Sequence, residues 1–295
     1  MIHTKFNIRL LLLIGVLFIL FHPEGYSQGT DIRSGKQKHF YLGLGISPAQ
    51  TSIVYTGAST ISKVTSAKKG SLFFSTEIGY SFSKVFGIST GFGYGSYATD
   101  LTLDSYNANY AATDSESEAY TRYIDGSNIT EAQKISFVEI PLALNLHIPF
   151  SDKFGMYLQS GVNFSIPMQK TYNSTGTFSY SGYYSAYKVL LEGISYEGFL
   201  SDNKNDVSGS LNVKSMYQEL FASAGFQLTF QSVWISIGGF YNMMLSDMSG
   251  TSSTSPSTGT FQLSTKPDQM KSMMEGSTKG KASAMGLKIA FRFYL

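Results

Sequence analysis

Five charged residues interrupt otherwise apolar stretches of the chain: Glu77, Glu139, Glu219, Lys288 and Arg292. Carboxylates and amines brought together in a narrow interior could relay protons or ions. They could also form a purely structural network, because an unpaired buried charge is costly and buried carboxylates therefore pair with cations. The structural network is favoured, since the same stretches carry bulky aromatic residues that would fill such an interior.

Histidine is the side chain to seek for acid–base catalysis, and the chain has four. His3 and His22 belong to the N-terminal stretch, whereas His39 and His147 lie at the ends of apolar segments. A general base needs a partner and a substrate within hydrogen-bond reach. Both positions are expected at the end of the fold that has short connections, so the sequence predicts no catalytic residues.

Neither a cofactor nor a metal site is predicted. The chain has no cysteine, which removes disulfides and thiolate ligands. Residues 201–209 read SDNKNDVSG, but Lys204 occupies a ligand position of a calcium loop and Val207 replaces its turn glycine. Within residues 266–276 three methionines share a helical face, which predicts a short helix that buries them rather than a soft-metal site: Met270, Met273 and Met274.

The elements that position these residues are segments in which every second side chain is apolar, the period of a β-strand. Three tight connections are predicted, with the sequences FSKVFG, FSDKFG and FQSVW. Pro141 predicts a bulge or a local bend, because a proline donates no hydrogen bond to a ladder. The eight segments are 39–47, 71–81, 85–97, 135–147, 155–165, 217–229, 234–244 and 282–294, and the four long connections are 48–70, 98–133, 167–215 and 246–279.

The two faces of these segments differ in charge. The apolar face has no charged residue, whereas the polar face carries the five charged residues together with many glycines and scattered aromatics. A water-facing surface carries about 25–35% charged residues, so the polar face suits a crowded interior and the apolar face suits lipid. An open sheet edge in lipid would leave backbone groups unpaired. We therefore expect an all-β fold, an eight-stranded antiparallel up-and-down transmembrane β-barrel with long external loops.

Features near both ends of the chain agree with a β-barrel in a membrane. Lys5 and Arg9 precede an apolar run and then small residues, which predicts a signal peptide at 1–27 and a barrel domain at 28–295. The formal net charge of +2 gives no indication of a nucleic-acid partner. Aromatic residues gather at the ends with tight connections, as in the girdle of a membrane barrel: Phe82, Phe86, Phe150, Phe154, Phe230, Phe291, Phe293 and Tyr294.

Three stretches resemble a known family. FVEIPLALNL in the fourth segment, GVNFSIP in the fifth and the terminal KIAFRFYL are similar to the outer membrane protein beta-barrel domain family, the group that includes the PorT proteins. The resemblance implies a barrel in the outer membrane of a Gram-negative cell, placed there by the outer-membrane insertion machinery. For the PorT proteins it also implies a role in a secretion and gliding apparatus.

We expect a non-enzymatic protein with a plugged lumen that acts through its external loops. Its partners would be outer-membrane lipid and an envelope protein or a glycan. A hydrolase or lipid-modifying enzyme and a PorT-like subunit of a secretion or motility apparatus are the alternatives. Tyrosine beside serine and glycine is typical of adaptable binding surfaces, which makes these loop residues candidates for binding: Tyr172, Tyr180, Tyr183, Tyr184 and Tyr187.

Overall fold

The computed structural model describes residues 39–57, 63–230, 233–250, 263, 264, 266 and 269–295. All of them belong to one compact unit, Lys38–Leu295. The expected signal peptide lies outside the described residues. Within the described part of the chain no helix is both long and apolar enough to cross a membrane.

The described chain is almost entirely β-structure. Two short 3-10 turns, η3 and η4, are its named helical elements. The bounds are β1 (His39–Gly57), β2 (Thr65–Ser81), β3 (Phe86–Thr113), β4 (Ala119–Pro149), β5 (Phe154–Tyr184), β6 (Val189–Glu192), η3 (Ser195–Glu197), β7 (Asn203–Ser210), β8 (Tyr217–Phe230), β9 (Val233–Met244), η4 (Met273–Gly276) and β10 (Ser277–Tyr294).

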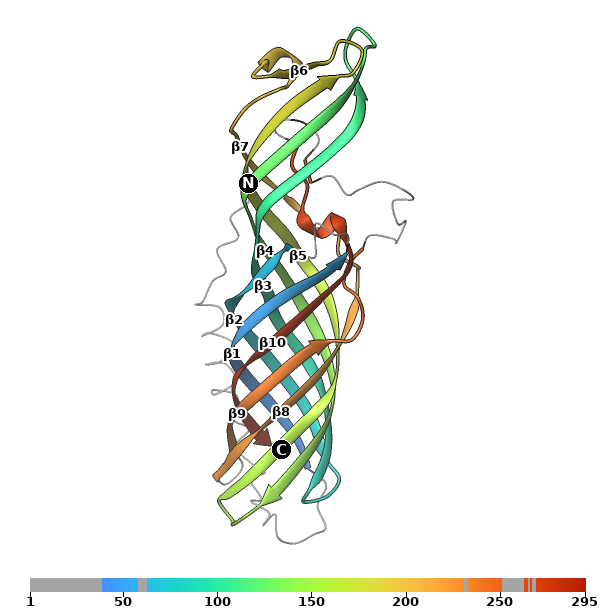
Figure 1. Ribbon diagram of the computed structural model, residues 1–295. Helices are drawn as coiled ribbons and strands as arrows, with labels where there is room; N and C mark the ends of the chain where they lie inside the picture. The colour runs from blue at the N-terminus through green and yellow to red at the C-terminus, as the bar shows by residue number, and fades with distance from the viewer. Residues whose placement is uncertain (1–38, 58–62, 231–232, 251–262, 265, 267–268) are drawn as a thin grey trace, which may run out of the picture. The chain divides into compact units, whose positions relative to one another are not determined.

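Eight of the strands form a closed antiparallel ring in the order β1, β2, β3, β4, β5, β8, β9 and β10 (Figure 1). The last strand returns to the first, with Leu42 opposite Phe293 and Ile46 opposite Ile289. The expected fold class is confirmed, and so are the eight segments and the tight connections after β2 and β4. Among the described residues, each of these eight strands pairs with a neighbour on both sides, so the ring has no free edge where it is closed.

Side-chain burial alternates along most of the length of the strands of the ring, as the pattern of polar and apolar residues predicted. In β3, Phe86, Ile88 and Phe92 are exposed, whereas the glycines between them are buried. The scattered aromatics of the polar face point inward, and Tyr41, Phe137 and Tyr157 are buried. Phe82, Phe86, Phe150, Phe154 and Phe230 are exposed near the tight connections. Tyr294 departs from the expected girdle, because its ring lies against Trp234 and Tyr41 inside the barrel.

Strands β3, β4 and β5 run far beyond their predicted ends, and β1, predicted at 39–47, runs on to Gly57, so that much of the expected loop 48–70 is also strand. Strand β3 has 28 residues, and β4 and β5 have 31 each, although about 9–11 residues suffice to cross a membrane. The expected loops at 98–133 and 167–215 are therefore largely strand: β3 and β4 stay paired as far as Thr113 and Ala119, and β5 also pairs with β6 and β7. We call this upper part of β3, β4 and β5, with β6 and β7, the extension.

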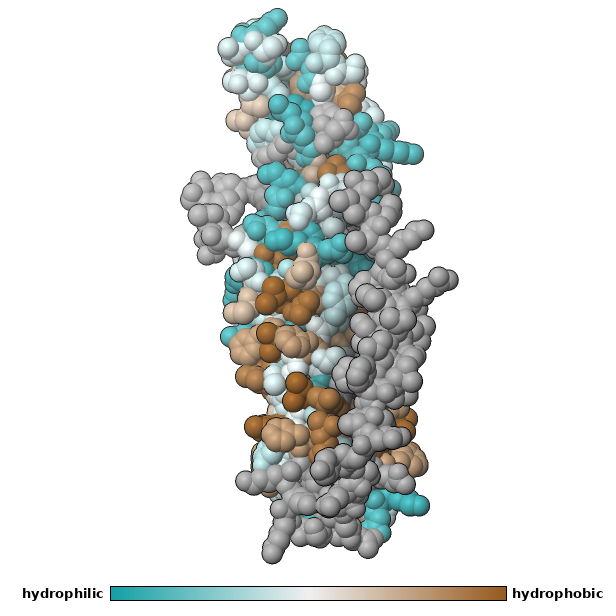
Figure 2. All heavy atoms as spheres, turned by 180° about the vertical axis from the view of Figure 1, so that it is seen from behind, coloured by the Kyte–Doolittle hydropathy of each residue, from teal (hydrophilic) through white to brown (hydrophobic). Residues whose placement is uncertain are grey.

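The polarity of both faces inverts along the same strands. On the outer face of β10, Phe291, Leu287 and Met285 are followed by Ser283 and Lys281. On the inner face of the ring, glycine and polar residues give way above to a buried apolar cluster that includes Ile53, Leu101, Ile124, Ile129, Phe178 and Met248. Figure 2 shows the result on the surface, with hydrophobic residues gathered below and hydrophilic residues above.

The inversion of polarity explains why the upper halves of the strands were predicted to be loops. A segment whose outer face is hydrophilic and whose inner face is apolar resembles the strand of a water-soluble sheet.

Pro141, for which we predicted a bulge or bend, interrupts the ladder between β3 and β4 at Ile140 and Pro141, yet the register is the same on both sides. It remains paired with Asn163 of β5.

Candidate functional site

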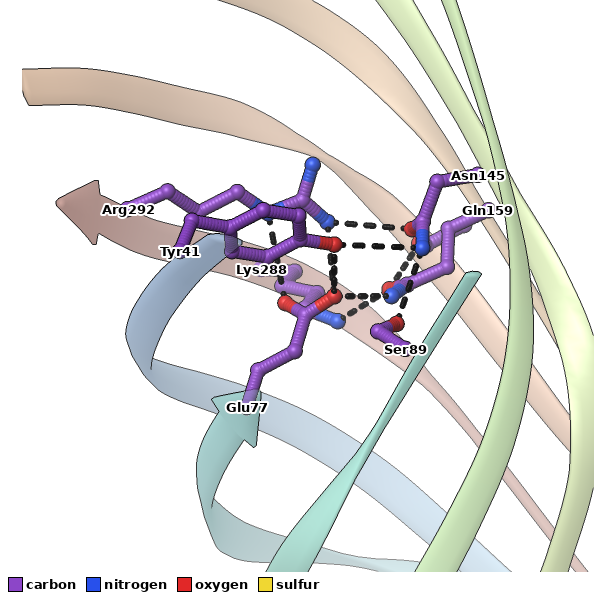
Figure 3. A network of polar contacts seen from close by, with 8 residues as sticks. Tyr41, Glu77, Ser89, Asn145, Gln159, Lys288 and Arg292 are labelled. Carbon is purple, nitrogen blue, oxygen red and sulfur yellow. Dashed lines mark hydrogen bonds and ion pairs between the residues drawn. The ribbon is translucent and has the colours of Figure 1, made fainter. Parts of the chain in front are cut away.

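An ion pair between β2 and β10 forms the centre of the lower lumen (Figure 3). Arg292 Nη2 lies 3.2 Å from Glu77 Oε1, and Arg292 Nε donates to Glu77 Oε2 at 3.2 Å. The hydroxyl of Tyr41 donates to the same carboxylate at 2.9 Å. The Arg292 guanidinium carbon also lies 5.1 Å from the centre of the Tyr41 ring. The carboxylate is thus paired and hydrogen-bonded, as a buried charge requires.

Amide side chains connect this ion pair to the opposite wall. Arg292 Nη2 donates to Asn145 Oδ1 at 3.2 Å, and Asn145 Nδ2 donates to Ser89 Oγ at 2.8 Å. Gln159 Nε2 donates to Glu77 Oε1 at 3.0 Å while its oxygen accepts from Lys288 Nζ at 2.7 Å. The network joins β1, β2, β3, β4, β5 and β10. The neutral members of the network were not among the predicted site residues, although Asn145 and Gln159 lie on the polar face of their segments.

The other two carboxylates lie inside the barrel but are held by neutral donors. Glu139 accepts from Asn163 Nδ2 at 2.9 Å. Glu219 accepts from the hydroxyls of Tyr97 and Ser165 at 2.8 and 3.1 Å. The expectation that the buried carboxylates pair with cations therefore holds for Glu77, and no described ion pair involves the other two.

A small cavity of about 60 Å³ lies in the lower lumen, lined by Glu77, Glu139, Gln159, Asn163 and Lys288 among others. A space of this size admits a few water molecules. Above it the inward rings pack across the barrel, with the Tyr97 and Phe137 centroids 5.0 Å apart and Phe240 at 5.8 Å from Phe73. This aromatic layer obstructs the described lumen between the charged network and the extension.

A single carboxylate, Glu131, holds the upper interior together. Its side chain is fully buried, and it accepts four hydrogen bonds. Ser174 Oγ donates at 2.6 Å, Ser272 Oγ at 2.7 Å and the backbone N–H of Met273 at 2.8 Å, and Gln133 Nε2 donates at 2.5 Å. Glu131 thereby fastens η4, from the connection before β10, to β4 and β5. This role of Glu131 was not predicted, because residues 98–133 were expected to be a loop.

The methionines of residues 266–276 are buried as predicted, although the helix is a 3-10 turn of four residues rather than an α-helix. Met270, Met273 and Met274 belong to the same buried apolar cluster as Ile53 and Met248. Ser272 caps the turn by accepting from the backbone N–H of Met274 at 3.2 Å. Together they close the upper interior from the side of β10.

The candidate binding tyrosines are mostly in strand β5 and not in a loop. Tyr180 and Tyr184 are buried, and Tyr172 and Tyr183 are half-buried. Tyr187, in the turn after β5, is exposed. The expectation of a tyrosine-rich loop is therefore wrong for the first four, because pairing with β4, β6 and β7 extends the strand through them.

Beneath that turn lies an aromatic platform, which we define as Tyr120, Arg122, Tyr180, Tyr184 and Phe199. The Tyr120 and Tyr184 rings stack at 5.1 Å, and Phe199 meets Tyr120 edge-on at 5.6 Å. The Arg122 guanidinium lies 5.4 Å from the rings of both Tyr180 and Phe199 and donates to the carbonyl of Gly198 at 2.6 Å. The platform anchors the chain around η3 to β4.

The remaining candidates for chemistry are dispersed. The ring of His147 lies 4.6 Å from that of Trp234, at the end of the barrel with tight connections. The SDNKNDVSG stretch is largely strand β7, paired with β5. Across the described residues no three His, Cys, Asp or Glu side chains come together in a way that could hold a metal ion.

Solved structures that resemble this chain are outer-membrane proteins. The attachment invasion locus protein Ail of Yersinia pestis, in complex with the heparin analogue sucrose octasulfate, is 13% identical, with a TM-score of 0.30 over 86% of this chain and 99% of that one. OprG of Pseudomonas aeruginosa is 14% identical, with a TM-score of 0.36 over 90% of this chain and 99% of that one. No activity, ligand or partner follows at these values. No protein-family model matches the chain, and no curated protein matches it significantly.

Proposed function

We propose that this protein is a small outer-membrane β-barrel with a plugged lumen and no enzymatic activity, which binds an envelope partner through its extension. The observation that carries the proposal is the inversion of polarity along the strands. The same strand β10 presents Leu287 outward below and Lys281 outward above, while the interior changes in the opposite sense.

Two solvents explain this inversion. A lipid-facing surface excludes charge and a water-facing surface requires it, so a strand that changes its outer residues from apolar to charged passes from one to the other. The exposed apolar belt is contiguous and contains Phe40, Leu44, Phe92, Leu144, Phe226 and Leu287. A belt of this extent on a protein in water would be an aggregation surface.

Binding is favoured over transport by the interior. The charged network joins six strands through hydrogen bonds to neutral side chains on four of them, and the aromatic layer and the rest of the buried apolar cluster lie above it. Eight strands leave an interior just wide enough for its own side chains. Among the described residues, the extension is then the largest part of the protein available to a partner.

The two alternatives differ in what supports them. For a hydrolase, His147 is the one histidine after residue 40, and it lies against Trp234 at the opposite end from the extension, which disfavours that function. For a PorT-like subunit of a secretion or motility apparatus, the extension would serve as the contact. Co-purification from envelopes separates a complex subunit from a free binding protein.

The membrane proposal is tested by fractionation and gel migration. The protein is expected in the outer-membrane fraction, released by detergent and not by alkaline carbonate. The unheated protein should migrate differently from the heated one, because a closed barrel resists unfolding by the detergent of the gel. Recovery in the soluble periplasmic fraction would overturn the proposal.

A further inference from the structure

The outermost end of the extension presents apolar side chains to solvent. Tyr196 is 85% exposed, Tyr187 62% and Leu190 51%, and Val189 is also exposed. They lie on the turn after β5, on β6 and on η3. We call this surface the tip, defined as residues 185–197.

The tip is held in place rather than loosely attached. The aromatic platform lies directly beneath it, and the hydroxyl of Tyr184 donates to Asp114 Oδ2 at 3.0 Å. Asp114 Oδ1 accepts from the backbone N–H groups of Glu116 and Glu118 at 3.0 and 2.9 Å, which fixes the turn between β3 and β4 beside the tip. These backbone donors lower the pKa of Asp114. The exposed side chains are therefore presented by a rigid support, which lowers the entropy lost on binding.

Strand β6 adds a free edge to this surface. It is the terminal strand of the sheet order and pairs with β5 alone among the described residues. Natural proteins usually protect such an edge by keeping the strand short or with charged residues, proline or a covering segment. Strand β6 is short, with four residues. Here Val189, Leu190 and Leu191 occupy three of its four positions, a composition suited to pairing with another strand.

The charges around the tip indicate what that strand would carry. Residues 114–122 and 185–197 contain five carboxylates and two cations, and one of the cations, Arg122, is buried in the platform. The five carboxylates are those of Asp114, Glu116, Glu118, Glu192 and Glu197. An acidic rim around an apolar centre complements a partner that combines basic and apolar residues.

We propose that the tip is the docking site for a basic, apolar segment of a partner protein, which adds as a strand to β6. This inference rests on the proposed function, since it requires the extension to lie outside the membrane. A second copy of this chain is disfavoured, because two tips would bring like charges together. An anionic lipid surface is disfavoured for the same electrostatic reason.

The test uses two labelled peptides of equal length, one alternating lysine with valine and the other alternating glutamate with valine. Binding to the purified full-length protein in detergent is measured by fluorescence anisotropy. The lysine peptide should bind, and its affinity should fall as the salt concentration is raised, because salt screens the attraction between opposite charges. The glutamate peptide should not bind.

Variants locate the binding. The double variant Leu190→Ser with Tyr196→Ser should bind the lysine peptide about tenfold more weakly or worse, and a tenfold loss corresponds to ~1.4 kcal/mol. The matched control is Val54→Ser with Met216→Ser, because these residues are 54% and 50% exposed but lie outside the tip. The control should bind as the unaltered protein does.

Several outcomes would overturn the inference. These are equal binding of the two peptides, an equal loss in the control, a dimer in light scattering that Leu190→Ser abolishes, or binding to anionic vesicles that Tyr196→Ser abolishes. Heat-modifiable migration of every variant shows that the barrel is intact. If the lysine peptide does not bind but the protein is an intact membrane barrel, the docking inference is wrong and the proposed outer-membrane location still holds. If the protein is recovered as a soluble protein, the proposed location itself is wrong.

Discussion

Glu131 joins three segments of the upper interior. Four donors from three segments converge on its carboxylate, and each loses its partner when the side chain is removed. A buried donor left without a partner costs about 1–3 kcal/mol.

Glu131→Ala is expected to destabilise the extension by ~3 kcal/mol or more, while the lower barrel persists. Limited proteolysis should then cut the connection before β10 faster, with heat-modifiable migration unchanged. Glu131→Gln is the matched variant, because its amide oxygen still accepts, and it should give an intermediate rate. Equal cleavage of all three proteins would show that Glu131 does not fasten η4.

Arg292 makes the corresponding prediction for the lower lumen. Arg292→Leu removes the cation from Glu77 and should destabilise the barrel by about 3 kcal/mol, because an uncompensated buried charge is worse than none. Denaturant unfolding followed by gel migration measures the loss. The double variant Glu77→Leu with Arg292→Leu should cost less than the sum of the two single changes. An additive double variant would mean that the ion pair contributes nothing specific.

At the scale of the element, β10 carries the boundary between lipid and water within one strand. Leu287 and Ser283 point to the same outer face, four residues apart, on opposite sides of the change in polarity. The two positions therefore form a matched pair for the same substitution.

Leu287→Arg should impair insertion by about 2–4 kcal/mol, the cost of a cation on the lipid face near the midplane. Ser283→Arg should have little effect, because Lys281 already occupies the same face just beyond it. The yield of heat-modifiable protein in the membrane fraction measures both. If arginine were tolerated at position 287 but prevented insertion at position 283, the part of β10 around Ser283 would lie in lipid and the part around Leu287 in water, contrary to the proposal.

At the scale of the whole molecule, the lumen above the charged network is obstructed by packed side chains. The aromatic layer is the lower part of the buried apolar cluster, which continues above it to Ile53, Ile124 and Met248. A change in the upper part of the cluster should therefore leave the aromatic layer in place.

The protein is expected to give no steady conductance in a planar bilayer. Glu131→Ala should also stay closed, because it disturbs the extension and not the rings of Tyr97 and Phe137. Opening should require a further change in that layer, such as Phe137→Ala with Phe240→Ala. A steady ionic current through the unaltered protein would contradict the plugged lumen and favour a transport function.

The sequence by itself determined the ring and the direction of its faces. A period of two sets which side chains share a face, and the absence of charge on the face of Phe40, Leu142 and Leu287 sets what that face can meet. Closure followed because unpaired backbone is not tolerated in lipid. The inward position of Glu77, Lys288 and Arg292 followed from the same alternation.

The tertiary structure alone decided the length of the strands and the partners of the inward groups. Above the belt the alternation persists with its polarity reversed, so a local pattern cannot distinguish a strand that leaves the bilayer from a polar loop. Contacts such as Ser272 with Glu131 join residues 141 positions apart. Such contacts depend on the register in which the ring closes, and that register is a property of all eight strands together.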